Sequence, residues 1–291
     1  MATENLQKFA WLSIVTSLAT IVLKFGAFYL SNSISLLSDA IESLVNLAAG
    51  LIALWALWLS GQPADASHAY GHNKAEYFSS GAEGILILVA AISIIWTAVD
   101  RFVHPAVLDQ LGWGLAISFV ASGCNLVTSR ILLAVGKRRD SITLEADAHH
   151  LMTDVWTSVG IGTGLLIVLF VPGLAWIDPV LAVLVGLNII VTAYKLLRRS
   201  ADGLMDAALP ATEIAALRAA LDALLANTGD LLDLRTRKSG AQRFIELTIA
   251  LPATMTVGHS HRICDAIEAS IHQRFSPPPR VIVHVEPRGA E

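Results

Sequence analysis

Two pairs of metal-competent side chains lie inside apolar stretches of the sequence, and both pairs have the same spacing. Glu42 stands four residues before Asn46, and His150 stands four residues before Asp154. Residues four apart share one face of a helix. Ionisable groups in a membrane helix are costly and by default mark a functional site. Two such helices facing each other predict a site that closes around one divalent cation.

The donor types indicate which cation is bound and what replaces it. Imidazole and carboxylate ligands suit zinc, iron, cobalt or manganese, and one His nitrogen with three oxygens makes a tetrahedral site. With His150 neutral, Glu42 and Asp154 supply two negative charges, which balance one divalent cation. Bare carboxylates at membrane depth bind protons instead, so metal binding expels protons, as in a proton/metal exchanger. The alternative is that these groups only hydrogen-bond between helices.

The composition is that of an integral membrane protein. Of the 291 residues, 54% are hydrophobic and 15% are charged, whereas a soluble domain has roughly 25% charged residues. The net charge of −4 argues against a nucleic acid partner. Cys124 and Cys264 are solitary, so neither a disulfide framework nor a CxxC metal motif is expected. The first apolar run is too long for a cleavable signal peptide and predicts a retained span.

Six apolar segments are long enough, or nearly so, to cross a bilayer, which takes about 20 residues. They predict an all-α bundle of six transmembrane helices at 9–30, 34–59, 80–99, 111–135, 144–171 and 176–197. Lys and Arg gather before the first span, after the second, after the fourth and after the sixth. By the positive-inside rule, both termini lie in the cytoplasm and the protein is a multi-pass protein of the cytoplasmic (inner) membrane.

After Arg199 the sequence has the patterns of a soluble domain. Periodicity predicts helices and strands, in the order αββαβ, at 212–225, 231–237, 244–251, 257–275 and 281–285. We therefore expect a transmembrane domain at 1–206 and a small cytoplasmic α+β domain at 207–291. A domain of about 85 residues is near the lower limit for independent folding. Dimerisation is expected to stabilise it.

A second candidate metal cluster follows the second span. Asp65, His68 and His72 offer a carboxylate and two imidazoles at a short spacing that fits three ligands on one metal. A solvated polar turn would have the same composition. Nearby, Lys74 and Asp206 both lie next to the membrane on the cytoplasmic side, where an ion pair would connect the loop to the start of the soluble domain.

A third candidate cluster lies in the predicted cytoplasmic domain. His284 and Glu286 alternate along a strand, so they point to the same face. His261 begins the preceding helix, from which it could meet them. The alternative interpretation is that these are ordinary surface side chains.

Together these features resemble the cation diffusion facilitator family. The resemblance covers nearly the whole chain: six spans, ligand pairs on the second and fifth, and an αββαβ tail. Two stretches, QPADxxHxxGHxKAE at 62–76 and DLRTRxSG at 233–240, resemble its bacterial YiiP/FieF ferrous-iron/zinc efflux branch. The resemblance implies a homodimeric, proton-coupled exporter of divalent metal that works by alternating access.

The resemblance also implies roles for single positions. It implies a transport site of Glu42, Asn46, His150 and Asp154, a loop site of Asp65, His68 and His72, a salt bridge of Lys74 with Asp206, and a cytoplasmic metal site of His261, His284 and Glu286. The branch has two aspartates on the second span where this chain has Glu42 and Asn46, so one carboxylate is lost. Leu232 and Thr248 stand where the branch has histidines, so its two-metal cytoplasmic site is expected to hold one metal or none.

We therefore expect a metal/proton antiporter in a lipid bilayer, and not an enzyme. Zn²⁺ is the expected substrate, and Fe²⁺, Mn²⁺, Co²⁺ and Cd²⁺ are compatible with the donors. One alternative is a membrane metal sensor or partner protein that no longer transports, with Asn46 as its mark. A second is an intramembrane metalloenzyme, for which an HExxH motif is missing. A third, a small-molecule exporter, leaves the loop and tail histidines unexplained.

Overall fold

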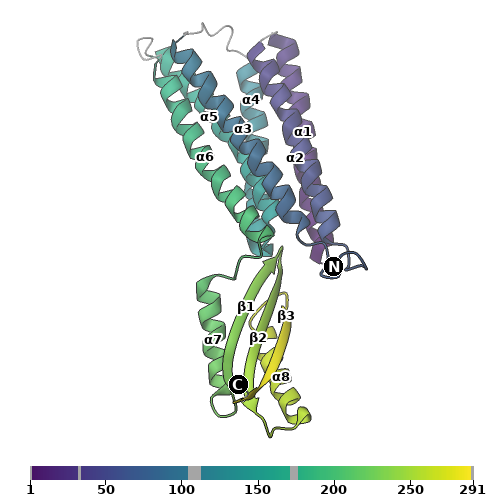
Figure 1. Cartoon of the computed structure of the whole chain (residues 1–291). Helices are drawn as coiled ribbons and strands as arrows, with labels where there is room; N and C mark the ends of the chain where they lie inside the picture. The colour runs from purple at the N-terminus through teal and green to yellow at the C-terminus, as the bar shows by residue number, and fades with distance from the viewer. Residues whose placement is uncertain (1, 32–33, 104–112, 171–175, 290–291) are drawn as a thin grey trace. The chain divides into compact units, whose positions relative to one another are not determined.

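The computed structural model covers the whole chain and describes residues 2–31, 34–103, 113–170 and 176–289. Some side chains inside these ranges are outside the description, and that of Glu42 is one of them. The chain divides into two compact units, Met1–Ala201 and Asp202–Glu291. Each unit is described by itself (Figure 1).

The first unit is a bundle of long helices, as the apolar segments predict. Its helices are α1 (Ala2–Ser31), α2 (Ile34–Ser60), α3 (Ala75–Val103), α4 (Trp113–Arg139), α5 (Ile142–Phe170) and α6 (Ile177–Leu204). Helix α3 begins ahead of the predicted apolar span at 80, because its polar first turn is held inside the bundle. There the Ser141 hydroxyl donates to the buried Glu76 carboxylate at 2.6 Å.

Helix α5 lies at the centre of this bundle. It packs against α1, α2, α3 and α4, and its first turns are buried. Ala10 of α1 and Ala148 of α5 are almost completely buried in the same core cluster as Leu57 and Leu132. Small residues allow helix backbones to approach closely in a membrane. A functional side chain on α5 therefore meets partners from several helices.

Helices α3 and α6 pack closely against each other at two glycine residues. A Cβ atom at Gly84 would lie 2.9 Å from the Leu197 side chain, and one at Gly186 would lie 2.6 Å from the Ile95 side chain. A larger residue at either position would have to push the neighbouring helix away.

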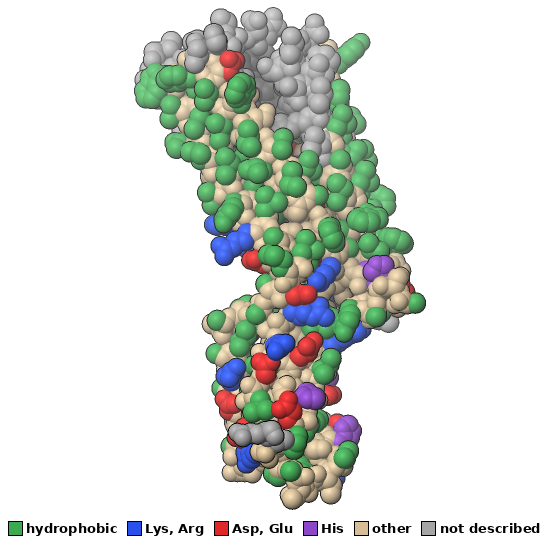
Figure 2. Space-filling model, in the orientation of Figure 1, with side chains coloured by type: hydrophobic (Ala, Val, Ile, Leu, Met, Phe, Trp, Pro, Cys, Tyr) green, Lys and Arg blue, Asp and Glu red, His purple; other side chains and the backbone are tan. Residues whose placement is uncertain are grey.

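The outer surface of the helical unit is apolar. Large hydrophobic side chains such as Val22, Trp96 and Val127 are more than half exposed, and Figure 2 shows hydrophobic side chains covering the visible face of this unit. By length and composition, the described stretches Leu6–Gly26, Ala75–Asp100 and Phe119–Arg139 could each cross a membrane. Such a surface is suited to lipid rather than to water.

The second unit has the predicted order αββαβ, and the α+β prediction is confirmed. Its elements are α7 (Ala211–Leu225), β1 (Asp230–Ser239), β2 (Gln242–Pro252), α8 (Val257–His272) and β3 (Arg280–Arg288). The strands form one sheet in the order β1-β2-β3. Strands β1 and β2 are antiparallel, and Gly240 in their turn has a φ of 56°, which favours glycine. Strands β2 and β3 are parallel, so α8 makes the crossover between them.

One apolar core holds the second unit together. Leu217, Leu221 and Leu225 recur every four residues along α7, and they pack with Ile267 and Ile271 of α8 against one face of β2. On β3 the valines alternate with exposed side chains, which include His284 and Glu286. The candidate ligands on β3 therefore lie on the exposed side of that strand.

Candidate metal site

The candidate ligands of α2 and α5 meet inside the helical bundle. Asn46, His150 and Asp154 are 1%, 4% and 6% exposed. The Asn46 amide nitrogen donates to the Asp154 carboxylate, and His150 Nε2 lies 2.7 Å from Asn46 Oδ1. The i,i+4 spacing on α5 thus places both side chains on the face that meets α2. The backbone of Glu42 lies one turn before Asn46 in α2, but its side chain is outside the described residues.

The hydrogen bonds of Asn46 define the state of the histidine ring. A carboxylate only accepts, so the amide NH₂ group faces Asp154 and the amide oxygen faces His150. His150 Nε2 is then the protonated nitrogen. The other nitrogen, Nδ1, is buried and has no hydrogen-bond partner among the described residues. The imidazole is therefore neutral and keeps a lone pair with which it can bind a metal.

Asn125 of α4 is a further member of this site, and the sequence patterns do not reveal it. Its side-chain nitrogen donates to Asp154 Oδ2 at 3.1 Å, and the residue is only 1% exposed. Its amide oxygen is buried without a partner among the described residues. An isolated amide within an apolar helix is the only signal that the sequence offers, since Asn125 has no ligand-type residue four positions away.

The loop between α2 and α3 brings the second cluster together. Asp65, His68 and His72 each offer a ligand atom, and these atoms lie within 4.8 Å of one another. Asp65 Oδ1 lies 3.3 Å from His68 Nδ1, and Asp65 Oδ2 lies 3.5 Å from His72 Nε2. The two imidazole rings are 4.4 Å apart between centroids. The two residue types and this spacing fit a site for a first-row divalent metal.

The loop backbone holds Asp65 in position without help from other helices. Asp65 Oδ1 accepts from the Ser67 hydroxyl at 2.9 Å, the Ser67 N–H at 2.9 Å and the His68 N–H at 2.6 Å. The Ser67 hydroxyl and the His68 N–H are the main causes that lower the pKa of Asp65 to about 2. Gly71, at a φ of 87°, turns the chain so that His72 can stand at the start of α3. The carboxylate is therefore ionised at neutral pH.

The second unit, which is the predicted cytoplasmic domain, does not bring its three candidate ligands into one cluster among the described residues. It is called the cytoplasmic unit below. His284 Nε2 lies 3.6 Å from Glu286, whereas His261 Nε2 lies 3.8 Å from Asp265 on its own helix. Thr248, where a histidine is expected in the resembled branch, is the register partner of His284. The cytoplasmic site stays a prediction.

The predicted salt bridge joins residues of different units. Lys74 belongs to the helical unit and Asp206 to the cytoplasmic unit. Within its own unit, Asp206 Oδ1 lies 3.2 Å from Arg237 on β1. The pairing of Lys74 with Asp206 remains a prediction.

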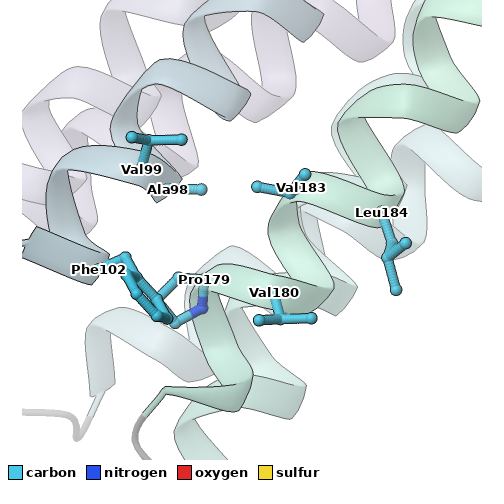
Figure 3. A pocket seen from close by; sticks show the side chains of 7 residues that line it. All are labelled: Ala98, Val99, Phe102, Pro179, Val180, Val183 and Leu184. Carbon is cyan, nitrogen blue, oxygen red and sulfur yellow. The ribbon is translucent and has the colours of Figure 1, made fainter.

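A cavity of about 220 Å³ lies between α3 and α6 and is apolar. It is lined by three side chains of α3, among them Phe102, and by four of α6 (Figure 3). None of the lining residues is a metal ligand, so the cavity is separate from the candidate site.

Two family models together match nearly the whole chain. The cation efflux transmembrane domain matches residues 10–205, and the cation efflux protein cytoplasmic domain matches residues 209–288. The chain belongs to the cation efflux (cation diffusion facilitator) family. Its members are cation transporters and not enzymes, and the resemblance identified from the sequence motifs is confirmed.

Relatives of this family match over most of their length. An uncharacterized transporter of Synechocystis is 43% identical, with 99% of this chain and 92% of the relative covered. The cation-efflux pump FieF of Salmonella typhimurium is 30% identical, with 92% of this chain and 88% of the pump covered. A solved structure of the putative zinc transporter CzrB is 33% identical and covers 28% of this chain and 99% of that chain, with a TM-score of 0.27.

Proposed function

We propose that this cation efflux protein exports divalent transition metal from the cytoplasm in exchange for protons, by alternating access. The observation that carries the proposal is the buried contact of Asn46, His150 and Asp154 inside an apolar helical unit. Buried ionisable groups at membrane depth are retained only where they serve a substrate path or a proton relay. The donor set is suited to both tasks.

Binding of metal requires the amides around Asp154 to turn. In the structure Asn46 and Asn125 both present N–H groups to the Asp154 carboxylate. A cation beside this carboxylate repels N–H groups and attracts amide oxygens, so each amide reverses when metal arrives. The rotation of Asn46 also releases His150, whose ring then offers a nitrogen. When the metal leaves on the outer side, Asp154 and Glu42 take up protons.

The donors favour a first-row transition metal. One imidazole nitrogen, one or two carboxylates and amide oxygens suit Zn²⁺, and they leave Fe²⁺, Mn²⁺, Co²⁺ and Cd²⁺ as further substrates. An amide oxygen is a harder and weaker ligand than a carboxylate. Asn46 therefore lowers the affinity for zinc relative to a site with a second aspartate.

The remaining candidate sites lie outside the bundle. We infer that the loop site of Asp65, His68 and His72 binds metal at the cytoplasmic surface, with both chain termini on the same side of the inner membrane. The cytoplasmic unit forms a homodimer, and His261, His284 and Glu286 bind metal in it. The salt bridge of Lys74 with Asp206 connects the two units.

Metal flux into proteoliposomes under an imposed pH gradient tests the proposal. We expect saturable Zn²⁺ uptake by the wild type and at least a roughly 100-fold lower rate for Asp154→Ala, because the variant loses a ligand and the acceptor of two amides. Asp222→Ala, which removes an exposed carboxylate of α7, serves as the control and keeps the wild-type rate. Equal rates for the wild type and Asp154→Ala would overturn the assignment of the site. Zinc binding without flux would instead favour a metal sensor.

A further inference from the structure

A second polar cluster is buried in the helical bundle, outside the proposed metal site. It joins α1, α3 and α5. The Ser13 hydroxyl donates to Asp147 Oδ1 at 3.0 Å, and the Ser79 hydroxyl donates to Glu83 Oε1 at 3.1 Å. Glu83 and Asp147 have no exposed surface, and both serines are at most 1% exposed. The bundle therefore carries two carboxyl groups that the proposed metal site does not use.

Each carboxyl group in this cluster has one satisfied oxygen and one unsatisfied oxygen. Glu83 Oε2 and Asp147 Oδ2 are buried without a hydrogen-bond partner among the described residues, and so is the hydroxyl of Ser17. Ser17 is one turn from Ser13 on α1, on the face that contacts Asp147. Glu83 and Asp147 also interact electrostatically with each other. Buried polar atoms normally have partners, so these oxygens point to a positively charged ligand.

The chemistry of the cluster selects the proton as this ligand. Two carboxyl groups that repel each other cannot both be ionised while they stay fully buried. One proton, carried by either carboxyl group, removes the repulsion between them. Zinc prefers nitrogen or sulfur ligands, and magnesium requires six oxygens in octahedral geometry. We propose that Glu83 and Asp147 form a shared proton site that carries one proton in each transport cycle, in addition to the protons that exchange with metal.

The position of Asp147 connects this site to the transport cycle, and to this extent the inference rests on the proposed function. Asp147 precedes His150 by three residues on α5, which is about 4.5 Å along the helix axis. Glu83 lies on α3, which packs against α5. A movement of α5 that reorients His150 and Asp154 therefore also changes the electrostatic interaction of Asp147 with Glu83. An O–H bond forms on one of the two carboxylates when the site faces outward, and it breaks when the site faces the cytoplasm.

Other titratable groups lie on the surrounding helices. They include Lys24 on α1, Glu42 on α2, Glu76 on α3, Arg130 on α4, and Glu145, His149, His150 and Asp154 on α5. Glu76 accepts from Ser141, Glu145 binds Arg199 at 2.6 Å, and His150 binds Asn46. The described electrostatic partner of Glu83 is Asp147.

The proton-to-metal ratio tests this proposal directly. Wild type, Glu83→Gln and Asp147→Asn are reconstituted in proteoliposomes, with the membrane voltage clamped at zero by potassium and valinomycin. The Zn²⁺ gradient at which net flux stops is then measured against the pH gradient. We expect each variant to lose one coupled proton, so that its Zn²⁺ gradient falls about tenfold per unit of pH difference. Glu76→Gln, a buried carboxyl on the same helix, keeps the wild-type ratio.

The outcomes separate this inference from the proposed function. If the wild type shows no flux driven by pH, the proposed function fails. If the wild type transports but both variants keep its ratio, only the shared proton site is wrong. Loss of one bound Zn²⁺ equivalent in either variant would show that Glu83 and Asp147 bind metal. That result would also overturn the shared proton site.

A second measurement does not depend on the variants folding. The infrared spectrum of the wild-type protein in lipid at neutral pH should contain the carbonyl band of a protonated carboxylic acid that exchanges slowly with heavy water. An infrared spectrum without this band would contradict the proposal.

Discussion

The transport site and the loop site use the same donor types in opposite surroundings. Asn46, His150 and Asp154 are almost completely buried, whereas the Asp65 and His68 side chains are 51% and 58% exposed. The buried ligands come from separate helices and are held by one another. The loop ligands come from one short segment, and its own backbone positions Asp65.

This difference sets what each site must give up to bind metal. In the bundle the donors already satisfy one another, so a metal must replace hydrogen bonds between helices. Binding there is therefore coupled to helix packing, as a transporter requires. The loop carboxylate is ionised and in place, so the proposed binding of a metal there requires no helix to move. The predictions below test this contrast between coupled and independent binding.

Substitution of Asn46 by aspartate should have the largest effect on the buried site. Asn46→Asp replaces a neutral amide that faces Asp154 by a second carboxylate, and a nearby opposite charge strengthens metal binding at low dielectric. Isothermal titration of the solubilised protein should show zinc binding that is about tenfold tighter and releases more protons.

The matching loop variant is the control for this effect. Asn73→Asp adds a carboxylate beside His72 at a half-buried position of the loop, outside the proposed transport site, and the affinity of the buried site should not change. Weaker zinc binding by Asn46→Asp would mean that Asn46 does not face the metal.

Removal of Asn125 should have an effect of similar size, but on metal flux rather than on binding affinity. Asn125→Ala removes one N–H donor to Asp154 and one buried amide oxygen, and loss of a group that orients a ligand typically costs 10–100-fold. Metal flux should fall by about tenfold, with a smaller change in metal binding by the loop. Asn188→Ala removes an exposed amide of α6 and should transport like the wild type. An unchanged flux for Asn125→Ala would show that this contact is only structural.

Asn125 also shows where prediction from the sequence ends. The pairs on α2 and α5 could be predicted, because two ligand types four residues apart share a helix face. The loop cluster could be predicted from its short spacing. Asn125 is a single amide, and its role depends on how α4 packs against α5, which no local pattern specifies. The same holds for Glu83 and Asp147, which meet only through the packing of α3 on α5.

The fold was more predictable than the site. Apolar length predicted the helical bundle, and alternation predicted the three strands, because both are properties of single segments. The exposed residues of the sheet show what the sequence pattern cannot predict. His284 and Glu286 share a face of β3 as the alternation requires, but the position of His261 relative to them depends on the direction in which α8 leaves the sheet.

The smallest predicted effect concerns the preorganisation of the loop. The Ser67 hydroxyl is the largest cause of the low pKa of Asp65, so Ser67→Ala should move that pKa from about 2 toward the ordinary 3.8. Because the folded pKa is lowered, the hydrogen bonds of the ionised carboxylate persist above pH 3.8 and are lost as pH falls through 2. The carboxyl ¹³C chemical shift of Asp65, followed by NMR on the protein in lipid nanodiscs, measures this midpoint.

At neutral pH the same variant should weaken metal binding by the loop only about threefold, since the lost hydrogen bond is exposed to solvent and its net contribution is small. Zinc flux through the bundle should stay unchanged, because no helix contact of the transport site involves Ser67. Ser260→Ala, which removes the hydroxyl of a half-buried serine of α8, is the matched control. A loss of flux in Ser67→Ala equal to its loss of loop binding would mean that the two sites are coupled, and the contrast between them would be wrong.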